Sequence, residues 1–198
     1  MKKIAIIILS ISVFLTQSLR AEVKPYAFGD IKYFNYGLEE SDLQALNTAL
    51  VNLGYASSTT STDNSAFGFE LGFGIDITSN FALEASYIDL GTLTINNTTT
   101  GPATTNKLEI DGSSVALTGV VKFGEEKQYF YARGGMHSWD LDGKLTSSLG
   151  VANFTLGDGT DFLFGIGYRA DMFRVGYDYY KIDDSDISSF SAGLIYNF

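Results

Sequence analysis

Along residues 187–198 the chain alternates strictly between large apolar residues and small or polar ones. Successive residues of a strand point to opposite faces, so the pattern predicts a strand with one apolar and one mostly polar face. The apolar face carries Phe190, Ala192, Leu194, Tyr196 and Phe198. A strand of this kind is typical of a wall that has lipid on one side and a narrow polar interior on the other.

Seven further segments carry the same alternation, at 26–34, 67–75, 81–88, 114–123, 129–139, 161–169 and 173–180. Bulky apolar residues occupy one face, whereas glycine, serine and charged residues are common on the other. In two segments, 26–34 and 129–139, the apolar alternation is less regular, and the charged residues show which face points into the interior. Gly134-Gly135 could hold a β-bulge, which would leave the facing of Trp139 open. With the terminal strand, the count is eight.

The connections between these segments alternate in length. The short connections are 76–80, 124–128 and 170–172. The long connections are 39–64, 91–112 and 141–159, with a tighter acidic turn at 183–186. Outer-membrane barrels have short periplasmic turns and longer external loops. The sequence therefore predicts an all-β fold, an eight-stranded antiparallel up-and-down transmembrane β-barrel with both termini on the periplasmic side.

The alternative is a soluble eight-stranded barrel of the lipocalin type, which would turn its large apolar residues inward around a ligand. Here the bulky face is the more uniform one, and it lies opposite a face rich in glycine, serine and charge. Eight inward faces of phenylalanine, tyrosine and leucine would overfill so narrow a barrel. The pattern therefore favours the membrane protein.

The first residues have the composition of a secretory signal peptide. Lys2-Lys3 precede an apolar run at 4–15, and a polar stretch follows and ends at Ala21. The run is too short to cross a bilayer, which takes about 20 apolar residues. We therefore expect residues 1–21 to be cleaved and residues 22–198 to form one barrel domain. Its destination would be the outer membrane of a Gram-negative bacterium, reached through the periplasm.

Net charge and cysteine content exclude one class of partner and two kinds of covalent feature. Cleavage would remove three basic residues (Lys2, Lys3 and Arg20) and no acidic one, which changes the net charge from −10 to −13. This acidity argues against nucleic acid as a partner, because nucleic-acid binding rests on cations that neutralise phosphates. The chain has no cysteine, which excludes a disulfide framework and a lipoprotein anchor.

The alternation sends nine charged side chains into the predicted lumen, namely Asp30, Lys32, Glu70, Glu84, Lys122, Arg133, Arg169, Arg174 and Asp178. Positive and negative charges nearly balance, whereas a selective channel usually has a ring of one sign. We therefore expect paired charges, Glu70 with Arg133 among them, to fill and rigidify the lumen. The alternative is a narrow porin or small-ion channel, because polar groups inside a membrane protein are candidates for function.

Residues 41–54 carry a helical signal within the first long connection. Ser41 to Gln44 fits a capping box, and Gly54 can end the helix. The apolar face of this helix comprises Leu43, Leu46, Leu50 and Leu53. This face either packs on the loop and the barrel rim or contacts lipopolysaccharide, a host protein or another cell-surface ligand.

Catalytic and metal-binding signals are weak. The acidic stretches 140–143, 158–161 and 183–186 lack the ligand spacing of a calcium loop, so we expect no metal and no cofactor. The single histidine, His137, precedes Ser138, which a regular strand directs to the opposite face. These two residues therefore cannot act as base and nucleophile, and we expect no enzymatic activity.

The C-terminal segments 159–180 and 190–198, together with residues 80–91, resemble the OmpA-like transmembrane β-barrel family. This resemblance implies an eight-stranded barrel that periplasmic chaperones deliver to the barrel-assembly machinery. It also implies a C-terminal assembly signal, formed by Phe190, Leu194, Tyr196 and Phe198. The chain departs from larger family members because no peptidoglycan-binding domain follows, so cell-wall anchoring is not carried over.

These features predict an integral outer-membrane barrel that serves as a structural element and surface scaffold, with an adhesin-like role. Its surroundings would be outer-membrane lipid and lipopolysaccharide, and its external loops would meet a host or cell-surface ligand. A narrow porin is the alternative. The fold itself does not name the ligand, because function on such a scaffold resides in the loops.

Overall fold

Strands make up most of the chain in the computed structural model, which describes residues 24–38, 40–52, 57–100, 104–148, 150–183 and 185–198. The elements are β1 (Lys24–Asn35), α2 (Glu40–Asn52), β2 (Ser57–Thr62), β3 (Ser65–Asp76), β4 (Phe81–Thr100), β5 (Thr104–Glu125), β6 (Gln128–Ser147), β7 (Gly150–Ala170), β8 (Phe173–Ile182) and β9 (Ser185–Asn197). The predicted signal peptide at 1–21 lies outside the described residues.

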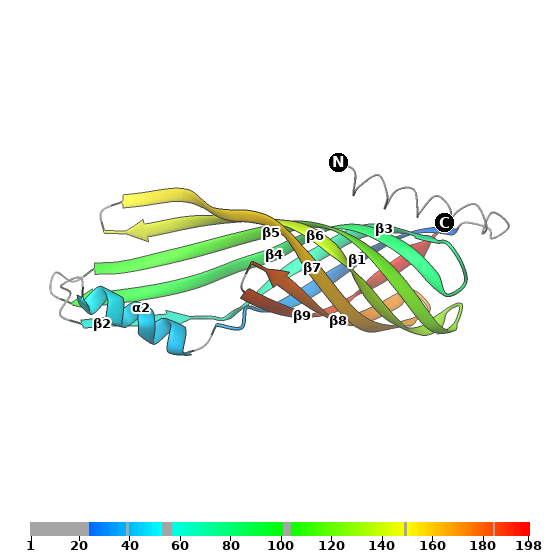
Figure 1. The fold of residues 1–198 in the computed structure, drawn as a ribbon, viewed down its shortest axis with the longest axis horizontal. Coiled ribbons are helices and arrows are strands. Elements are labelled where there is room, and N and C mark those ends of the chain that lie inside the picture. The colour runs from blue at the N-terminus through cyan, green and yellow to red at the C-terminus, as the bar shows by residue number, and fades with distance from the viewer. Residues whose placement is uncertain (1–23, 39, 53–56, 101–103, 149, 184) are drawn as a thin grey trace, which may run out of the picture.

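Eight of these strands form a closed antiparallel ring (Figure 1). The order around the ring is β4-β3-β1-β9-β8-β7-β6-β5, and β5 pairs with β4 to close it. The first and last strands are neighbours, with Tyr26 opposite Asn197, so β1 begins at the end where the C-terminus lies. The predicted eight-stranded up-and-down barrel is therefore confirmed.

An apolar belt surrounds the ring. Large side chains that face outward remain solvent-exposed, as the exposed fractions of Ile31 (68%), Leu117 (63%) and Phe164 (56%) show. Further members of the belt are Phe67, Phe73, Val115, Phe130, Phe162, Ile166, Phe173, Val175 and Phe190. A continuous apolar surface of this extent is stable only against lipid.

The belt ends at one level on neighbouring strands. Asp89 pairs with Ser113, Ser113 with Asp140, and Asp140 with Asp158, all at outward positions. Polar and acidic side chains thus replace apolar ones at the same height on β4, β5, β6 and β7. This row marks the outer boundary of the membrane-spanning zone.

The prediction of long loops at 91–112 and 141–159 is wrong. Strands β4, β5, β6 and β7 continue through both stretches and project beyond the rest of the barrel, as Figure 1 shows. The ladder of β4 with β5 reaches Thr99 opposite Thr104, and that of β6 with β7 reaches Ser147 opposite Gly150. The polar residues that suggest loops are instead the solvent face of strands outside the membrane, where the outward side need not be apolar.

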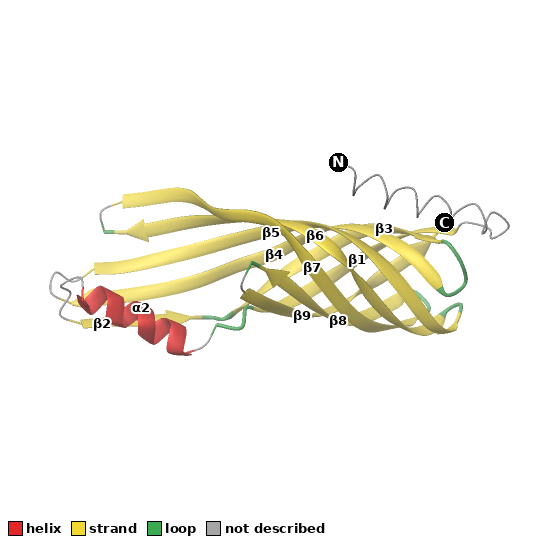
Figure 2. Ribbon diagram, in the orientation of Figure 1, coloured by secondary structure: helices red, strands yellow, loops and turns green. Residues whose placement is uncertain are grey.

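The first long connection also contains regular structure. Helix α2 occupies Glu40–Asn52, where the sequence predicts a helix, and lies beside β2 (Figure 2). Strand β2 is outside the ring and pairs with the projecting end of β4. Within the described residues, no helix is long and apolar enough to cross a membrane.

The β-bulge that Gly134-Gly135 could hold does not form. The register of β6 runs without a shift past these glycines on both sides, and the shifts occur instead at Leu90 on β4 and Leu156 on β7. Regular alternation therefore continues to Trp139, which faces inward and is 6% exposed. At the β4 bulge, Gly91 has a φ of 79°, and a Cβ there would lie 2.5 Å from the carbonyl oxygen of Phe67. Glycine suits both constraints.

A charge placed in the belt should be far more costly than the same charge placed above it. We expect Leu117→Arg to lower the free energy of unfolding by about 2–4 kcal/mol, because arginine would enter hydrocarbon. Thr105→Arg lies on the outward face of the same strand but beyond the belt, and should have little effect. Urea titrations of both variants in lipid bilayers test this, and equal costs would contradict the placement of the membrane.

Candidate functional site: a charged lumen below an apolar mouth

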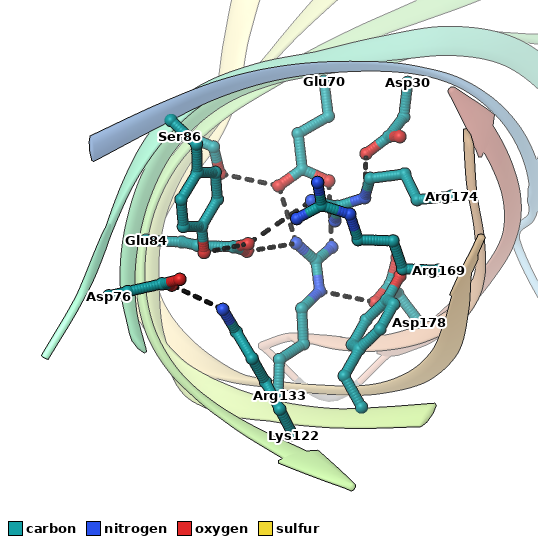
Figure 3. A network of polar contacts seen from close by, with 12 residues as sticks. Asp30, Glu70, Asp76, Glu84, Ser86, Lys122, Arg133, Arg169, Arg174 and Asp178 are labelled. Carbon is teal, nitrogen blue, oxygen red and sulfur yellow. Dashed lines mark hydrogen bonds and ion pairs between the residues drawn. The ribbon is translucent and has the colours of Figure 1, made fainter. Parts of the chain in front are cut away.

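A buried ionic network crosses the middle of the lumen and centres on Arg133 (Figure 3). Its Nη1 and Nη2 donate to the two carboxylate oxygens of Glu70 at 2.8 and 2.9 Å, and its Nε donates to Asp178 at 2.7 Å. Lys32 joins the same two carboxylates, with Nζ 2.9 Å from Glu70 and 2.6 Å from Asp178. Strands β1, β3, β6 and β8 are thus linked through side chains across the barrel.

The network extends toward the periplasmic end through Arg174. Its Nε lies 3.2 Å from Asp30 and its Nη1 lies 3.3 Å from Glu84. Glu84 also accepts a hydrogen bond of 2.9 Å from the Tyr26 hydroxyl and lies 3.7 Å from Arg133. Glu84 therefore connects the Arg174 group to the Arg133 group.

The connected network carries one more carboxylate than cation. Its cations are Lys32, Arg133 and Arg174, and its carboxylates are Asp30, Glu70, Glu84 and Asp178. Asp30 is the least supported of the four: neither of its buried oxygens has a partner in hydrogen-bond geometry, although one lies in ion-pair range of Arg174. We therefore expect Asp30 to contribute less than Asp178 to the stability of the barrel.

Two of the nine predicted lumen charges lie outside this network. Lys122 pairs with Asp76 near the periplasmic end, where its Nζ also lies 5.1 Å from the ring centre of Tyr129. Arg169 donates to the Tyr129 hydroxyl at 3.2 Å and to the backbone carbonyl of Asp171 at 2.7 Å. All nine side chains face inward and are at most 5% exposed.

Apolar clusters lie on both sides of the network. The inner face of β1 passes through all three layers in order, from Tyr26 and Phe28 through Asp30 and Lys32 to Phe34. The periplasmic cluster also contains Ala82, Val120, Tyr129, Tyr131 and Ile195. The external cluster also contains Ile88, Leu90, Ala116, Trp139, Leu163, Tyr180, Ile182 and Ile187. A cavity between the network and the periplasmic cluster measures only about 10 Å³, close to the space of one water.

His137 forms a buried contact that the sequence did not reveal. Its Nδ1 lies 2.9 Å from Oγ of Ser114 on the neighbouring strand, and its Nε2 lies 2.9 Å from the backbone carbonyl oxygen of Lys181. Ser138 faces outward, where its hydroxyl donates to the carbonyl of Gly159. The partner of Nε2 is a backbone carbonyl and not a carboxylate. The imidazole therefore has the contacts of a structural group that packs beside the external cluster.

Above the network, the barrel opens into a mouth with a cavity of about 310 Å³. Its lining is mainly apolar and includes Leu93, Leu141 and Trp139, of which Trp139 also belongs to the external cluster below. The indole nitrogen of Trp139 donates to Asp161 at 2.8 Å, and the backbone nitrogen of Asp183 donates to the same carboxylate oxygen at 3.0 Å. The mouth is thus a cup that ends on the external cluster.

The other predicted site residues lie at the surface or outside the described side chains. The proposed assembly signal faces the lipid side of the terminal strand, with exposed fractions from 48% at Leu194 to 71% at Phe198. On α2, Leu43 is half-buried, whereas the side chains of Leu46 and Leu50 and the whole of Leu53 lie outside the described part.

The carboxylates beyond the belt are mostly paired with donors on the protein. A hydrogen bond of 2.6 Å from Lys107 lowers the pKa of the Glu109 carboxyl. Asp111 accepts from Thr92, and Asp142 accepts from Thr155. Among the described residues, no group of three histidine, cysteine or acidic side chains is arranged to hold a metal ion.

A closed antiparallel ring, an apolar belt and a charged interior together define a transmembrane β-barrel of the Gram-negative outer membrane. Within that class, the ring of eight strands is the fold that the resemblance of its terminal segments to the OmpA-like barrels implies.

Comparisons with known proteins agree with this class but remain distant. No protein-family profile and no curated protein matches the chain. Among solved structures, the chain is similar to Ail, the attachment invasion locus protein of Yersinia pestis (15% identity, 89% of this chain and 97% of that chain, TM-score 0.47). It is also similar to the N-terminal β-barrel domain of Pseudomonas aeruginosa OprF (12% identity, 85% and 97%, TM-score 0.43) and to Neisserial surface protein A (15% identity, 90% and 100%, TM-score 0.39). With TM-scores below 0.5, the fold assignment rests on this chain's own strand ladder and belt.

The unequal roles of Asp30 and Asp178 give a matched pair of variants. Asp178→Asn should lower the free energy of unfolding by about 3–5 kcal/mol, because it withdraws the counter-charge of both Arg133 and Lys32 inside the barrel. Asp30→Asn removes the excess negative charge and should cost about 1 kcal/mol or less. Urea unfolding of both variants in bilayers measures the difference, and a cost for Asp30→Asn equal to that for Asp178→Asn would contradict this division of roles.

Proposed function

We propose that this protein is a non-conducting outer-membrane anchor that presents a binding platform outside the cell. The platform consists of the projecting ends of β4–β7 together with β2 and α2, and it gives the protein an adhesin-like role. The observation that carries the proposal is the Arg133 network, because it fills the lumen at the level where a channel would need a water path. The barrel would then serve as a rigid support for the projecting strands.

Three features support the non-conducting role. The network residues are bonded to each other across the lumen, so none is left as a free ring of charge. Apolar clusters lie on both sides of the network, and the cavity between the network and the periplasmic cluster measures only about 10 Å³. Buried ion pairs of this kind are costly to break, because each leaves an unpaired charge behind.

The projecting strands support the platform. They extend well past the level where the outward side chains become polar, so they lie in water rather than in lipid. A membrane anchor alone would not require such strands. Ail has been solved in complex with the heparin analogue sucrose octasulfate. For this chain, the acidic outer half favours a different kind of ligand.

Conductance in planar bilayers tests the closed lumen. Purified wild-type protein should give traces without reproducible openings, because the path for water is filled by side chains. A known porin reconstituted in parallel confirms that channels would be seen. Well-resolved openings of constant size from the wild-type protein would overturn the non-conducting role and establish the narrow porin instead.

Deletion of residues 41–54 tests whether α2 takes part in ligand binding by the platform. Intact cells that display the shortened protein should bind fewer host cells or surface ligands than cells that display the wild type. Equal surface levels of folded barrel, judged by resistance to SDS before boiling, are the necessary control. Unchanged binding at equal display would remove α2 from the platform.

A further inference from the structure

The projecting ends of β4–β7 form a sheet, which we call the projecting sheet. Its apolar face points inward and its polar face outward, whereas the barrel wall has its apolar face outward. The inner face continues the face of the lumen, and its positions nearest the barrel are apolar: Leu93 and Ile95 on β4, Leu108 and Ile110 on β5, Leu141 and Leu145 on β6, and Ala152 and Phe154 on β7. Farther out on β4 and β5 the inner face becomes polar, with Asn97 opposite Asn106. The outer face instead carries Thr92, Thr94, Lys107, Glu109, Asp111, Asp142, Lys144 and Thr155. An apolar face of this kind in water calls for a partner.

Only part of this inner face is covered. Asn47 of α2 accepts hydrogen bonds from Ser58 (3.0 Å) and Thr60 (2.7 Å) on β2, and both hydroxyls also accept from Asn97 of β4. The helix therefore lies over the β2 and β4 side of the face. On the far side, Leu145, Phe154 and Leu156 remain 37%, 41% and 45% exposed.

The uncovered part is shaped as a site rather than as a flat patch. Glycine at position 143 leaves room for the ring of Phe154, since a Cβ there would lie 2.6 Å from that ring. Leu156, the bulge residue of β7, and Ile110 join the face to the cavity of about 310 Å³ that has Trp139 at its base. Cavity and face thus form one apolar groove, which we call the mouth groove.

The charge around the mouth groove selects the kind of partner. Beyond the belt, the described strands carry only three bases, Lys107, Lys144 and Lys181, and each of them is already paired with an acid. The acids of the same region are Asp89, Glu109, Asp111, Asp140, Asp142, Asp158, Asp161, Asp183 and Asp186. Most of them are on the outer face of the sheet and act on the groove at a distance, whereas Asp183 lines the cavity. An anionic lipid or a sulfated polysaccharide would be repelled here, whereas a basic ligand would be attracted.

We propose that the mouth groove binds the apolar side of a basic amphipathic peptide segment, a proposal that rests on the platform role and names its partner class. The apolar side chains of the peptide would pack on Phe154, Leu156 and Ile110. Its lysine or arginine side chains would face Asp183 at the cavity and would be attracted over a longer range by the net negative charge of the region. An acyl chain alone would use the apolar surface but gain nothing from the acidic surroundings. The groove spans several strands and suits an extended ligand better than a single small molecule.

Trp139 gives a direct readout, because it is the single tryptophan of the chain and lies at the base of the groove. The full protein is placed in zwitterionic lipid nanodiscs without free detergent and titrated with a tryptophan-free leucine–lysine helical peptide that carries a nitroxide quencher. We expect saturable quenching of Trp139 that weakens with added salt. A leucine–glutamate peptide of the same pattern should quench far less.

Two variants on β7 distinguish apolar contact in the mouth groove from a general effect of added negative charge on peptide binding. Phe154→Asp places a carboxylate on the inner face and should weaken binding by about tenfold, since it removes an apolar contact worth more than 1 kcal/mol. Val151→Asp adds the same charge on the outer face, where Val151 is 61% exposed, and should not weaken binding. Resistance of both variants to SDS before boiling verifies that the barrels are folded.

Three outcomes would overturn this proposal. One is no quenching by the basic peptide, and another is an equal effect of the two variants. A third is quenching by a nitroxide-labelled neutral long-chain alcohol alone, which would assign the groove to lipid. None of these outcomes affects bilayer conductance or binding of cells through α2, so failure here is distinguishable from failure of the anchor and platform roles.

Discussion

The barrel depends on the burial of one guanidinium group. Arg133 is buried, so its charge is tolerable only while Glu70 and Asp178 bind it from two directions. Those carboxylates come from β3 and β8, and Lys32 of β1 joins them to each other. A shift of β1, β3, β6 or β8 would leave a charge unpaired in the lumen. The network therefore constrains the register of the ring and closes the interior.

The same requirement explains how the surface is divided. Because charges fill the interior within the membrane, the apolar residues face lipid, as the bilayer demands. Above the row from Asp89 to Asp158 there is no lipid, and the apolar face turns to the inner side of the projecting sheet. The bulges at Leu90 and Leu156 lie close to this transition. One continuous set of strands thus forms an anchor below and a platform above.

The facing of residues could be predicted from the sequence, because a period of two is a local property of each strand. The ring of eight strands and the lipid-facing belt follow from it, whereas the helix segment of the first connection follows from its capping box and the helical spacing of its leucines. Spatial partners could not be predicted in general, since they depend on the stagger around the whole ring. The pairing of Lys32 with Asp178 and the contact of Ser114 with His137 are examples. The sequence pattern suggests loops where the projecting strands lie. Inside the membrane a polar position marks the face toward the lumen, but outside the membrane either face of a strand can be polar, so the alternation no longer reveals the strand.

The coupling between Arg133 and Glu70 tests the central claim most directly. A double-mutant cycle with Arg133→Gln and Glu70→Gln, measured by reversible unfolding in bilayers, isolates their interaction from the effects of each residue alone. If this ion pair constrains the barrel, each single variant should be strongly destabilised and the double variant less so than the sum, with a coupling of about 2–3 kcal/mol. Additive effects, with a coupling near zero, would contradict the account.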